Sequence, residues 1–257
     1  MLAARLIPCL LLRGAGCVKT LRLRKPTYLG DPINIVRIFN DREVDELIVL
    51  DIDARREGRG PRLDHLADLA SECFMPLCYG GGVRSLEDIE RVFAVGVEKV
   101  SINTQAVLDP ALVESAARQF GSQSIVASID VRTDLLRRRR VVTHGGRRSH
   151  ALDPVAHARA MEERGAGEVL LNSVERDGVM GGYDLALVAD VARAVHVPVI
   201  ACGGAGSLED AARALRAGAS AAAAGSLFCF AGPSREVLVN YPDRRDIDAM
   251  LVSDERS

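Results

Sequence analysis

Short runs of consecutive apolar residues recur along this chain, and each is followed by a segment whose apolar residues return every three or four positions. The runs predict strands at 5–11, 47–52, 76–79, 98–102, 124–130, 168–172, 198–201 and 220–224. The intervening segments predict helices at 32–43, 62–72, 85–94, 109–119, 153–164, 184–195 and 207–216, with a last helix after 232. Strands that are apolar throughout are typical of parallel sheets buried on both faces.

This alternation predicts the α/β class, as a (β/α)8 TIM barrel that spans residues 1–257 as a single domain. An internal repeat supports the prediction. PLCYGGGVRSLEDIERVFAVG at 76–96 matches PVIACGGAGSLEDAARALRAG at 198–218, with a constant offset of 122 positions. A self-match at a long fixed offset indicates a barrel built from two matched half-barrels. The charged segment after about residue 242 is expected to fray.

Composition narrows the function classes without identifying one. Apolar residues make up 48% of the chain, and the net charge of -2 does not favour nucleic acid or an anionic membrane as a partner. No run approaches the ~20 apolar residues of a membrane helix, and the first run, interrupted by Pro8, predicts a core strand rather than a signal peptide. The six cysteines and five histidines show no metal-ligand spacing. We therefore expect reduced thiols in a cytoplasmic protein, with no metal and no cofactor.

One insertion interrupts the order of strands and helices. The segment RTDLLRRRRVVTHGG follows Asp130 and predicts a hairpin. Its four consecutive arginines at 137–140 could meet a phosphate, but such runs are usually solvated loops.

Segments rich in glycine or carrying a hydroxyl residue follow four of the predicted strands, on the face where barrel enzymes bind their substrates. GGG at 80–82 and GGAG at 203–206 each precede a SLED segment that opens a helix, while SINT at 101–104 and AGS at 224–226 follow the next strands. Glycines let backbone N–H groups approach an anion, and a helix N-terminus favours negative charge. Thr104, Ser226 and the amide of Asn103 can complete the two sets. The sequence therefore predicts two phosphate cradles and a small molecule with a phosphate at each end.

Acidic residues are expected between the two cradles. Asp51, Asp130 and Asp177 end strand-like runs, and Lys19 lies in the first loop. Carboxylates at the C-terminal ends of barrel strands are where catalysis usually takes place, and two of them can share acid and base work. Asp51 and Asp177 are equally suited to capping helices or bracing loops, whereas Asp130 has no such role in the sequence.

A larger set of motifs carries a family resemblance over about residues 1–230. These are IPCLL, VKT, GDPINIVRIFN, DELIVLDID, PLCYGGGVRSLED, VEKVSINT, FGSQSIVASID, THGG, GAGEVLLNS, RDGVMGGYD, PVIACGGAGSLED and AAAAGSLF. They resemble the cyclase subunit of imidazole glycerol phosphate synthase, a lyase of histidine biosynthesis. FGSQSIVASID and RDGVMGGYD favour the cyclase over its sister isomerase.

The resemblance implies a substrate with two phosphates. One phosphate would lie against Gly82, Asn103 and Thr104, and the other against Asp177, Gly178, Gly203, Gly204, Gly225 and Ser226. It also implies a glutaminase subunit on the N-terminal face of the barrel, whose ammonia crosses the core to the active site. The family's ring of charged residues at the ammonia entrance is matched here by Arg5, Glu46, Lys99 and Glu168. A salt-bridged plug that only stabilises the barrel is the alternative for these four residues.

The chain departs from the family at one catalytic position. The family's chemistry uses two aspartates, at the ends of strands 1 and 5; Asp130 matches the second, and Leu11 occupies the place of the first. Leucine cannot transfer a proton, and the loss of one member of an acid–base pair costs ~10²–10⁴ in rate. Full cyclase activity is therefore not expected.

The leucine is shared with one branch of the family. IPCLLL, GDPINIVRIFN, EGRGP, SECFMPLCYGGG, IACGGAGSLED and VLVNYP resemble the glycosyl amidation-associated paralogues. This likeness implies that the barrel and its glutaminase supply ammonia to a separate ATP-using sugar amidotransferase of surface-polysaccharide biosynthesis.

Three functions remain open at this point. The first is an ammonia-conducting paralogue with weak or no cyclase activity. The second is a working cyclase in which Asp130 and another group, Asp51 or Asp177 through water, cover both proton transfers. The third is an unrelated phosphosugar-binding barrel, because this fold supports many chemistries.

Overall fold

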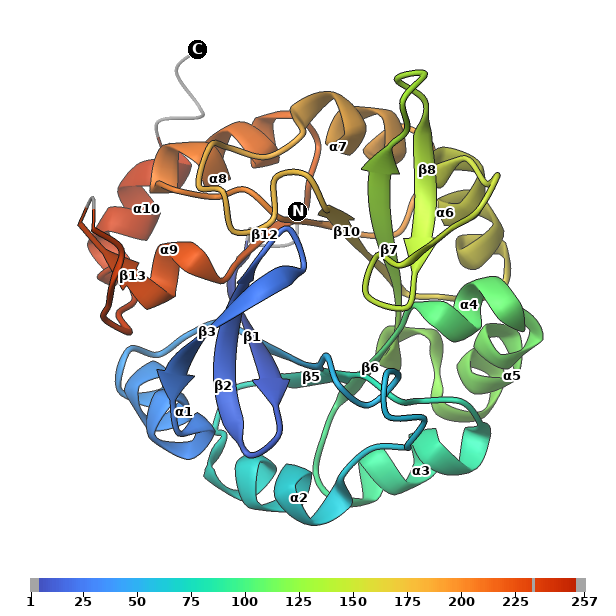
Figure 1. Cartoon of the computed structure of the whole chain (residues 1–257), viewed down its shortest axis with the longest axis horizontal. Helices are drawn as coiled ribbons and strands as arrows, with labels where there is room; N and C mark the ends of the chain where they lie inside the picture. Colours follow the sequence, from blue (N-terminus) through green and yellow to red (C-terminus); the bar gives the residue numbers. More distant parts are fainter. Residues whose placement is uncertain (1–4, 233, 253–257) are drawn as a thin grey trace.

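In the computed structural model, which describes residues 5–232 and 234–252, eight parallel strands close into a barrel surrounded by helices (Figure 1). Each strand pairs with the next around the ring, and the pairing of β7 with β10 closes it. The predicted (β/α)8 barrel is confirmed, and every predicted strand overlaps one of these eight. The strands are β1 (Arg5–Arg13), β4 (Leu47–Asp51), β5 (Leu77–Gly80), β6 (Lys99–Ile102), β7 (Ile125–Thr133), β10 (Glu168–Ser173), β11 (Val199–Cys202) and β12 (Ala221–Ala224).

Helices follow the strands and cover the outside of the barrel. The longer ones are α1 (Pro32–Asp41), α2 (Leu63–Glu72), α3 (Leu86–Ala94), α5 (Ala111–Phe120), α6 (Pro154–Glu163), α7 (Leu185–Ala192), α8 (Leu208–Arg216) and α10 (Arg244–Val252). The short ones are α4 (Thr104–Leu108), α9 (Ser226–Cys229) and the 3₁₀ turn η1 (Ser122–Ser124). No helix within the described ranges is long and apolar enough to cross a membrane.

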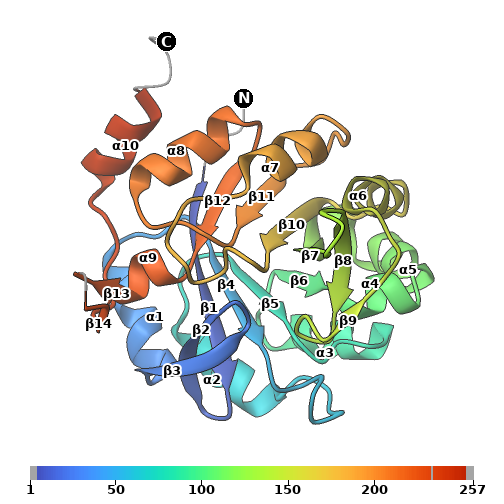
Figure 2. The same ribbon diagram turned by 45° about the horizontal axis from the view of Figure 1, so that its top comes forward.

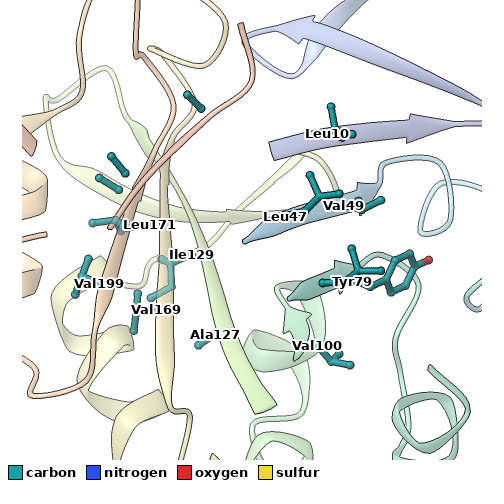
Figure 3. Packing of buried hydrophobic residues seen from close by; sticks show 14 of the residues in the cluster. Leu10, Leu47, Val49, Tyr79, Val100, Ala127, Ile129, Val169, Leu171 and Val199 are labelled. Carbon is teal, nitrogen blue, oxygen red and sulfur yellow. The ribbon is translucent and has the colours of Figure 1, made fainter. Parts of the chain in front are cut away.

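Each barrel strand sends alternate side chains to two different cores. In β1, Leu6 and Leu10 pack outward against the helices, while Ile7 and Cys9 point into the barrel interior. The outer layer is the larger one, and Figure 3 shows Leu10 with neighbours from the other strands. Because both faces are buried, apolar residues occupy most positions between the strand ends, which explains the continuous runs in the sequence.

The two halves of the barrel repeat their local chemistry as well as their sequence. Ser85 caps α3 by accepting a hydrogen bond from the N–H of Asp88 at 3.2 Å. Ser207 caps α8 in the same way, accepting from the N–H of Asp210 at 3.2 Å. A serine cap stabilises a helix by about 1 kcal/mol relative to alanine, so the repeated SLED segment defines where each helix begins.

Two hairpins extend beyond the barrel strands (Figures 1 and 2). The first, formed by β2 (Gly16–Leu21) and β3 (Arg24–Gly30), follows β1 where the sequence predicted only a glycine-rich loop. The expectation missed it because its outer strand is polar and exposed on most positions. The second is the predicted hairpin after Asp130, in which β7 pairs with β8 (Arg139–Thr143) and β8 with β9 (Arg148–Ser149). Arginines 138, 139 and 140 form ion pairs with nearby aspartates.

The C-terminal segment contacts the first barrel strand, β1. A short hairpin of β13 (Phe230–Ala231) and β14 (Glu236–Val237) follows α9. The hydroxyl of Tyr241 then donates a 2.8 Å hydrogen bond to the carbonyl of Leu6, and Ile247 of α10 is buried. The segment after about residue 242, expected to fray, thus contains α10, while residues 253–257 lie outside the described part of the chain.

Candidate functional site

A cavity of about 180 Å³ lies at the C-terminal ends of the barrel strands, and we call it the mouth. The loops after parallel strands meet at one end of the barrel, so residues far apart in sequence come together there. Every residue predicted for catalysis or phosphate binding lines this cavity. They are Lys19, Asp51, Gly82, Asn103, Thr104, Asp130, Asp177, Gly178, Gly203, Gly204, Gly225 and Ser226.

Two of the three carboxylates that line the mouth are held by cations. Arg59 donates to both oxygens of Asp51, at 2.8 and 3.1 Å, and the backbone N–H groups of residues 53 and 54 donate to the same carboxylate. Lys19 donates to Asp177 at 2.6 Å, and both side chains are more than nine-tenths buried. Burial alone would lower the pKa of Lys19, but the carboxylate beside it raises that pKa. Asp51 therefore holds the loop after β4, and Asp177 holds the strand β2.

Asp130 is the exception. The amide of Asn172 donates to its Oδ1 at 2.8 Å and that of Asn103 to its Oδ2 at 3.4 Å, and no cation pairs with it among the described residues. Burial raises the pKa of Asp130 to about 6, and the Asn172 hydrogen bond opposes that rise only in part. A carboxyl group that titrates near neutral pH can both give and take a proton.

Two polar atoms of the mouth have no partner within the described part of the chain. These are Oδ1 of Asn172 and Oγ of Ser101, both buried and both on residues that line the cavity. Buried polar atoms are rarely left unpaired, so each is available to a bound ligand. The sequence pointed to Ser101 only as part of the SINT segment and did not point to Asn172, because a polar residue at the end of a strand is a weak signal by itself.

The two predicted phosphate cradles both contain glycines with positive φ values. Gly81 and Gly82 adopt φ values of +119° and +75°, and Gly203 and Gly204 adopt +82° and +126°. A side chain on Gly203 would bring its Cβ to 2.4 Å from Oδ1 of Asn172. Only glycine fits these conformations and approaches, which explains the conserved spacing of the internal repeat.

Each cradle also carries a hydroxyl that the sequence predicted. In the first, Thr104 accepts a 3.3 Å hydrogen bond from the backbone N–H of His144. In the second, the guanidinium of Arg235 donates to the carbonyl of Gly178 at 2.8 Å and to Oγ of Ser226 at 3.5 Å. Arg235 was not expected from the sequence, since it lies in the turn between β13 and β14, beyond the repeat. It adds a positive charge beside the second cradle.

Leu11 lies in the mouth as well, which follows from the alternation along β1. Its neighbours in the strand, Leu10 and Leu12, face the helices, whereas Leu11 lines the cavity and is 5% exposed. Cys9 and Cys202 add further apolar surface. All six cysteines are free. No group of three or more potential metal ligands occurs in residues 5–232 and 234–252.

The four charged residues predicted for the opposite face form one closed set of ion pairs, which we call the N-terminal ring. Arg5 contacts Glu46 and, at 2.7 Å, Glu168, while Lys99 contacts Glu46 at 3.0 Å and Glu168 at 2.9 Å. Each cation thus bridges both carboxylates. The ring lies at the N-terminal ends of the barrel strands, below the apolar interior layer that contains Ile7.

Comparisons with known proteins agree with this geometry. A family model described as "Histidine biosynthesis protein" matches residues 5–232. A Pseudomonas aeruginosa protein named "Putative imidazole glycerol phosphate synthase subunit hisF2" is 53% identical over 249 residues, covering 96% of this chain and 99% of that protein. "Imidazole glycerol phosphate synthase subunit HisF" of Hyphomonas neptunium is 46% identical over 231 residues, covering 90% of this chain and 91% of its own. A Vibrio vulnificus relative, subunit hisF3, is 43% identical with 94% of each chain covered.

Proposed function

The chain belongs to the histidine biosynthesis protein family, and we propose that it conducts ammonia through its barrel and has weak or no cyclase activity. In this proposal a glutaminase docks on the N-terminal face. A sugar amidotransferase of surface-polysaccharide biosynthesis receives the ammonia, in the cytoplasm. One observation carries the proposal. Of the carboxylates that line the mouth in the described residues, Asp130 alone is not paired with a cation.

Cyclase chemistry in this family needs two groups that transfer protons. Asp130 is suited to one role, and the resemblance implies that Leu11 replaces the other. Asp51 and Asp177 are poor substitutes, because Arg59 and Lys19 form ion pairs with them and occupy their oxygens. Without a second group the rate is expected to fall by ~10²–10⁴.

The N-terminal ring supports the ammonia route. It leads to an interior layer that is apolar, with small side chains such as Cys78, Ala221 and Ala223 on one side. Neutral ammonia crosses an apolar core at a lower cost than ammonium, so such a layer favours the uncharged form. Ammonia enters only if ion pairs of the ring break. A docked glutaminase that contacts Arg5 or Lys99 competes with Glu46 and Glu168 for these cations.

The first experiment measures product formation from the bis-phosphate substrate of the cyclase with an ammonium salt. The purified barrel is compared with Leu11→Asp and with Leu11→Asn, which has the same shape as the aspartate but cannot transfer a proton. We expect little or no turnover in the natural chain and in Leu11→Asn, and a gain in Leu11→Asp. Turnover by the natural chain at ordinary enzyme rates would overturn the proposal.

Docking is tested separately, by mixing the barrel with its glutaminase and measuring complex formation and glutamine hydrolysis. We expect a stable complex and hydrolysis that responds to the barrel. The variant Lys99→Met, which breaks the ring, is expected to change the transfer of ammonia relative to hydrolysis. A barrel that neither binds nor affects the glutaminase would refute the conduit.

A working cyclase is the second candidate, favoured by the intact cradles and by the raised pKa of Asp130. Its test is Asp130→Asn, which should abolish turnover if Asp130 carries the chemistry. Unchanged turnover would eliminate this candidate. An unrelated phosphosugar barrel is no longer needed, given the family match.

A further inference from the structure

A second cavity of about 880 Å³ lies beside the mouth, and we call it the side chamber. Its walls come from the β2–β3 hairpin, the loop after β4 and the turn between β8 and β9. Leu23, Ile52, Arg55 and Gly145 line both cavities, so the chamber adjoins the mouth. One carboxylate, that of Asp53, lines it together with six arginines. The arginines are Arg13, Arg24, Arg55, Arg56, Arg147 and Arg148.

Most of this positive charge is not neutralised within the chain. Asp53 pairs with Arg56 at 2.9 Å and with Arg13 at 3.6 Å, so its charge is already shared. The other four arginines, at 24, 55, 147 and 148, have no carboxylate within ion-pair distance in the described ranges. Like charges gathered in a concave surface repel one another, and an anion in the cavity removes that cost.

The pKa of His144 responds to the positive charge of the chamber. Its Nε2 lies 3.3 Å from Nη2 of Arg55, and it lines the side chamber but not the mouth. Burial lowers the pKa of His144, and the charges of Arg55, Arg148 and His150 lower it further. The imidazole is therefore neutral at neutral pH, and among the described residues that line the chamber the arginines are the only cations.

Contacts within the chain fix the backbone of one wall of the chamber. His144, Gly145 and Gly146 all have positive φ values, between +57° and +75°, in the turn that presents Arg147 and Arg148. Arg132 donates a 2.7 Å hydrogen bond to the carbonyl of Gly146 and fixes this turn. A non-glycine residue with positive φ costs about 1 kcal/mol or more, which persists only where surrounding contacts enforce it. The backbone that carries Arg147 and Arg148 is thus held by contacts within the chain.

We propose that the side chamber binds the diphosphate group of a small organic molecule whose other end reaches the mouth. Arginine is the residue best suited to phosphate, because its guanidinium donates two parallel hydrogen bonds and keeps its charge. Four unpaired arginines match the charge of two phosphoryl groups. The volume lies within the ~300–1,000 Å³ typical of small-molecule sites. This site is separate from the two cradles and does not depend on ammonia transfer.

The test is the binding of inorganic pyrophosphate to the intact chain, followed by calorimetry and by the NMR signals of His144, assigned with His144→Gln. We compare the natural chain with Arg24→Ala/Arg148→Ala. Arg91→Ala is the control for loss of an arginine, because Arg91 is exposed on α3 and lines neither cavity. Ser226→Ala removes the hydroxyl of the second cradle. A loss of pyrophosphate binding in this variant would therefore indicate binding in the cradle and not in the chamber.

We expect pyrophosphate to raise the pKa of His144, because an anion beside the imidazole favours its charged form. The double variant should weaken this response at least tenfold in dissociation constant, whereas Arg91→Ala and Ser226→Ala should leave it unchanged. Calorimetric binding without any change at His144 would place the anion in the cradles and overturn the proposal. Equal affinities in the double variant and Arg91→Ala would do the same, as would no binding at all.

Discussion

Replacing Asp130 with asparagine is expected to stabilise the folded protein above about pH 6, although it removes the one carboxyl of the mouth suited to proton transfer. Burial raises the pKa of Asp130 from 3.8 to about 6. The folded state therefore holds this proton more tightly than the unfolded chain does. The stability that follows is fully present below about pH 4 and is lost as the pH rises through about 6. Above that pH the buried charge is a cost, and asparagine removes it.

The magnitude follows from the pKa and from two hydrogen bonds. The difference between 3.8 and about 6 corresponds to about 3 kcal/mol, which is an upper limit because Asp130 keeps some exposure to the cavity. Asn172 and Asn103 both donate to the carboxylate, and an asparagine oxygen can accept from only one of them. Losing the longer bond costs about 1 kcal/mol. The net gain is therefore about 1–2 kcal/mol.

Chemical denaturation of both proteins between about pH 4 and 8 measures this effect, since titrations shared by the two chains cancel in the difference. We expect the gap in unfolding free energy to be near zero or slightly negative at about pH 4 and to rise to a plateau above about pH 7. Asp134→Asn is the control of opposite sign, because hydrogen bonds from Arg138 lower the pKa of the partly exposed Asp134. A gap that does not change with pH would refute the raised pKa of Asp130.

Two further predictions concern the N-terminal ring and the second cradle. Glu168→Gln keeps the shape of the ring but leaves both of its cations with one carboxylate. We therefore expect a loss of about 1–3 kcal/mol in unfolding free energy, and a smaller loss in high salt. An unchanged midpoint of urea unfolding would contradict this expectation. Gly203→Ala combines a φ of +82° with a contact of 2.4 Å to Asn172, so a loss of roughly 2–4 kcal/mol is expected. The control Gly14→Ala, with φ +59° and no atom within 4 Å, should lose only about 1 kcal/mol, and equal losses would exclude the close contact as the cause.

The sequence alone was sufficient for the barrel, because local chemistry defines each of its elements. Strands buried on both faces favour apolar residues on both sides, and the repeated SLED segments place a serine cap where α3 and α8 begin. The β2–β3 hairpin escaped prediction because β3 is largely exposed and polar, so no burial pattern marks it. Residues at the C-terminal ends of barrel strands must meet, so the lining of the mouth was also predictable.

What each of those residues can do was decided by contacts between distant parts of the chain. Asp51, Asp130 and Asp177 look alike in the sequence, as acids at strand ends, yet Lys19 neutralises one from 158 positions away and Arg59 neutralises another. Asp130 has no paired cation among the described residues, and burial raises its pKa to about 6. The side chamber also depends on the tertiary structure, because its arginines come from β1, β3, the loop after β4 and the segment at 147–148. Charge interactions depend on distance and burial in space, and neither can be obtained from the order of residues.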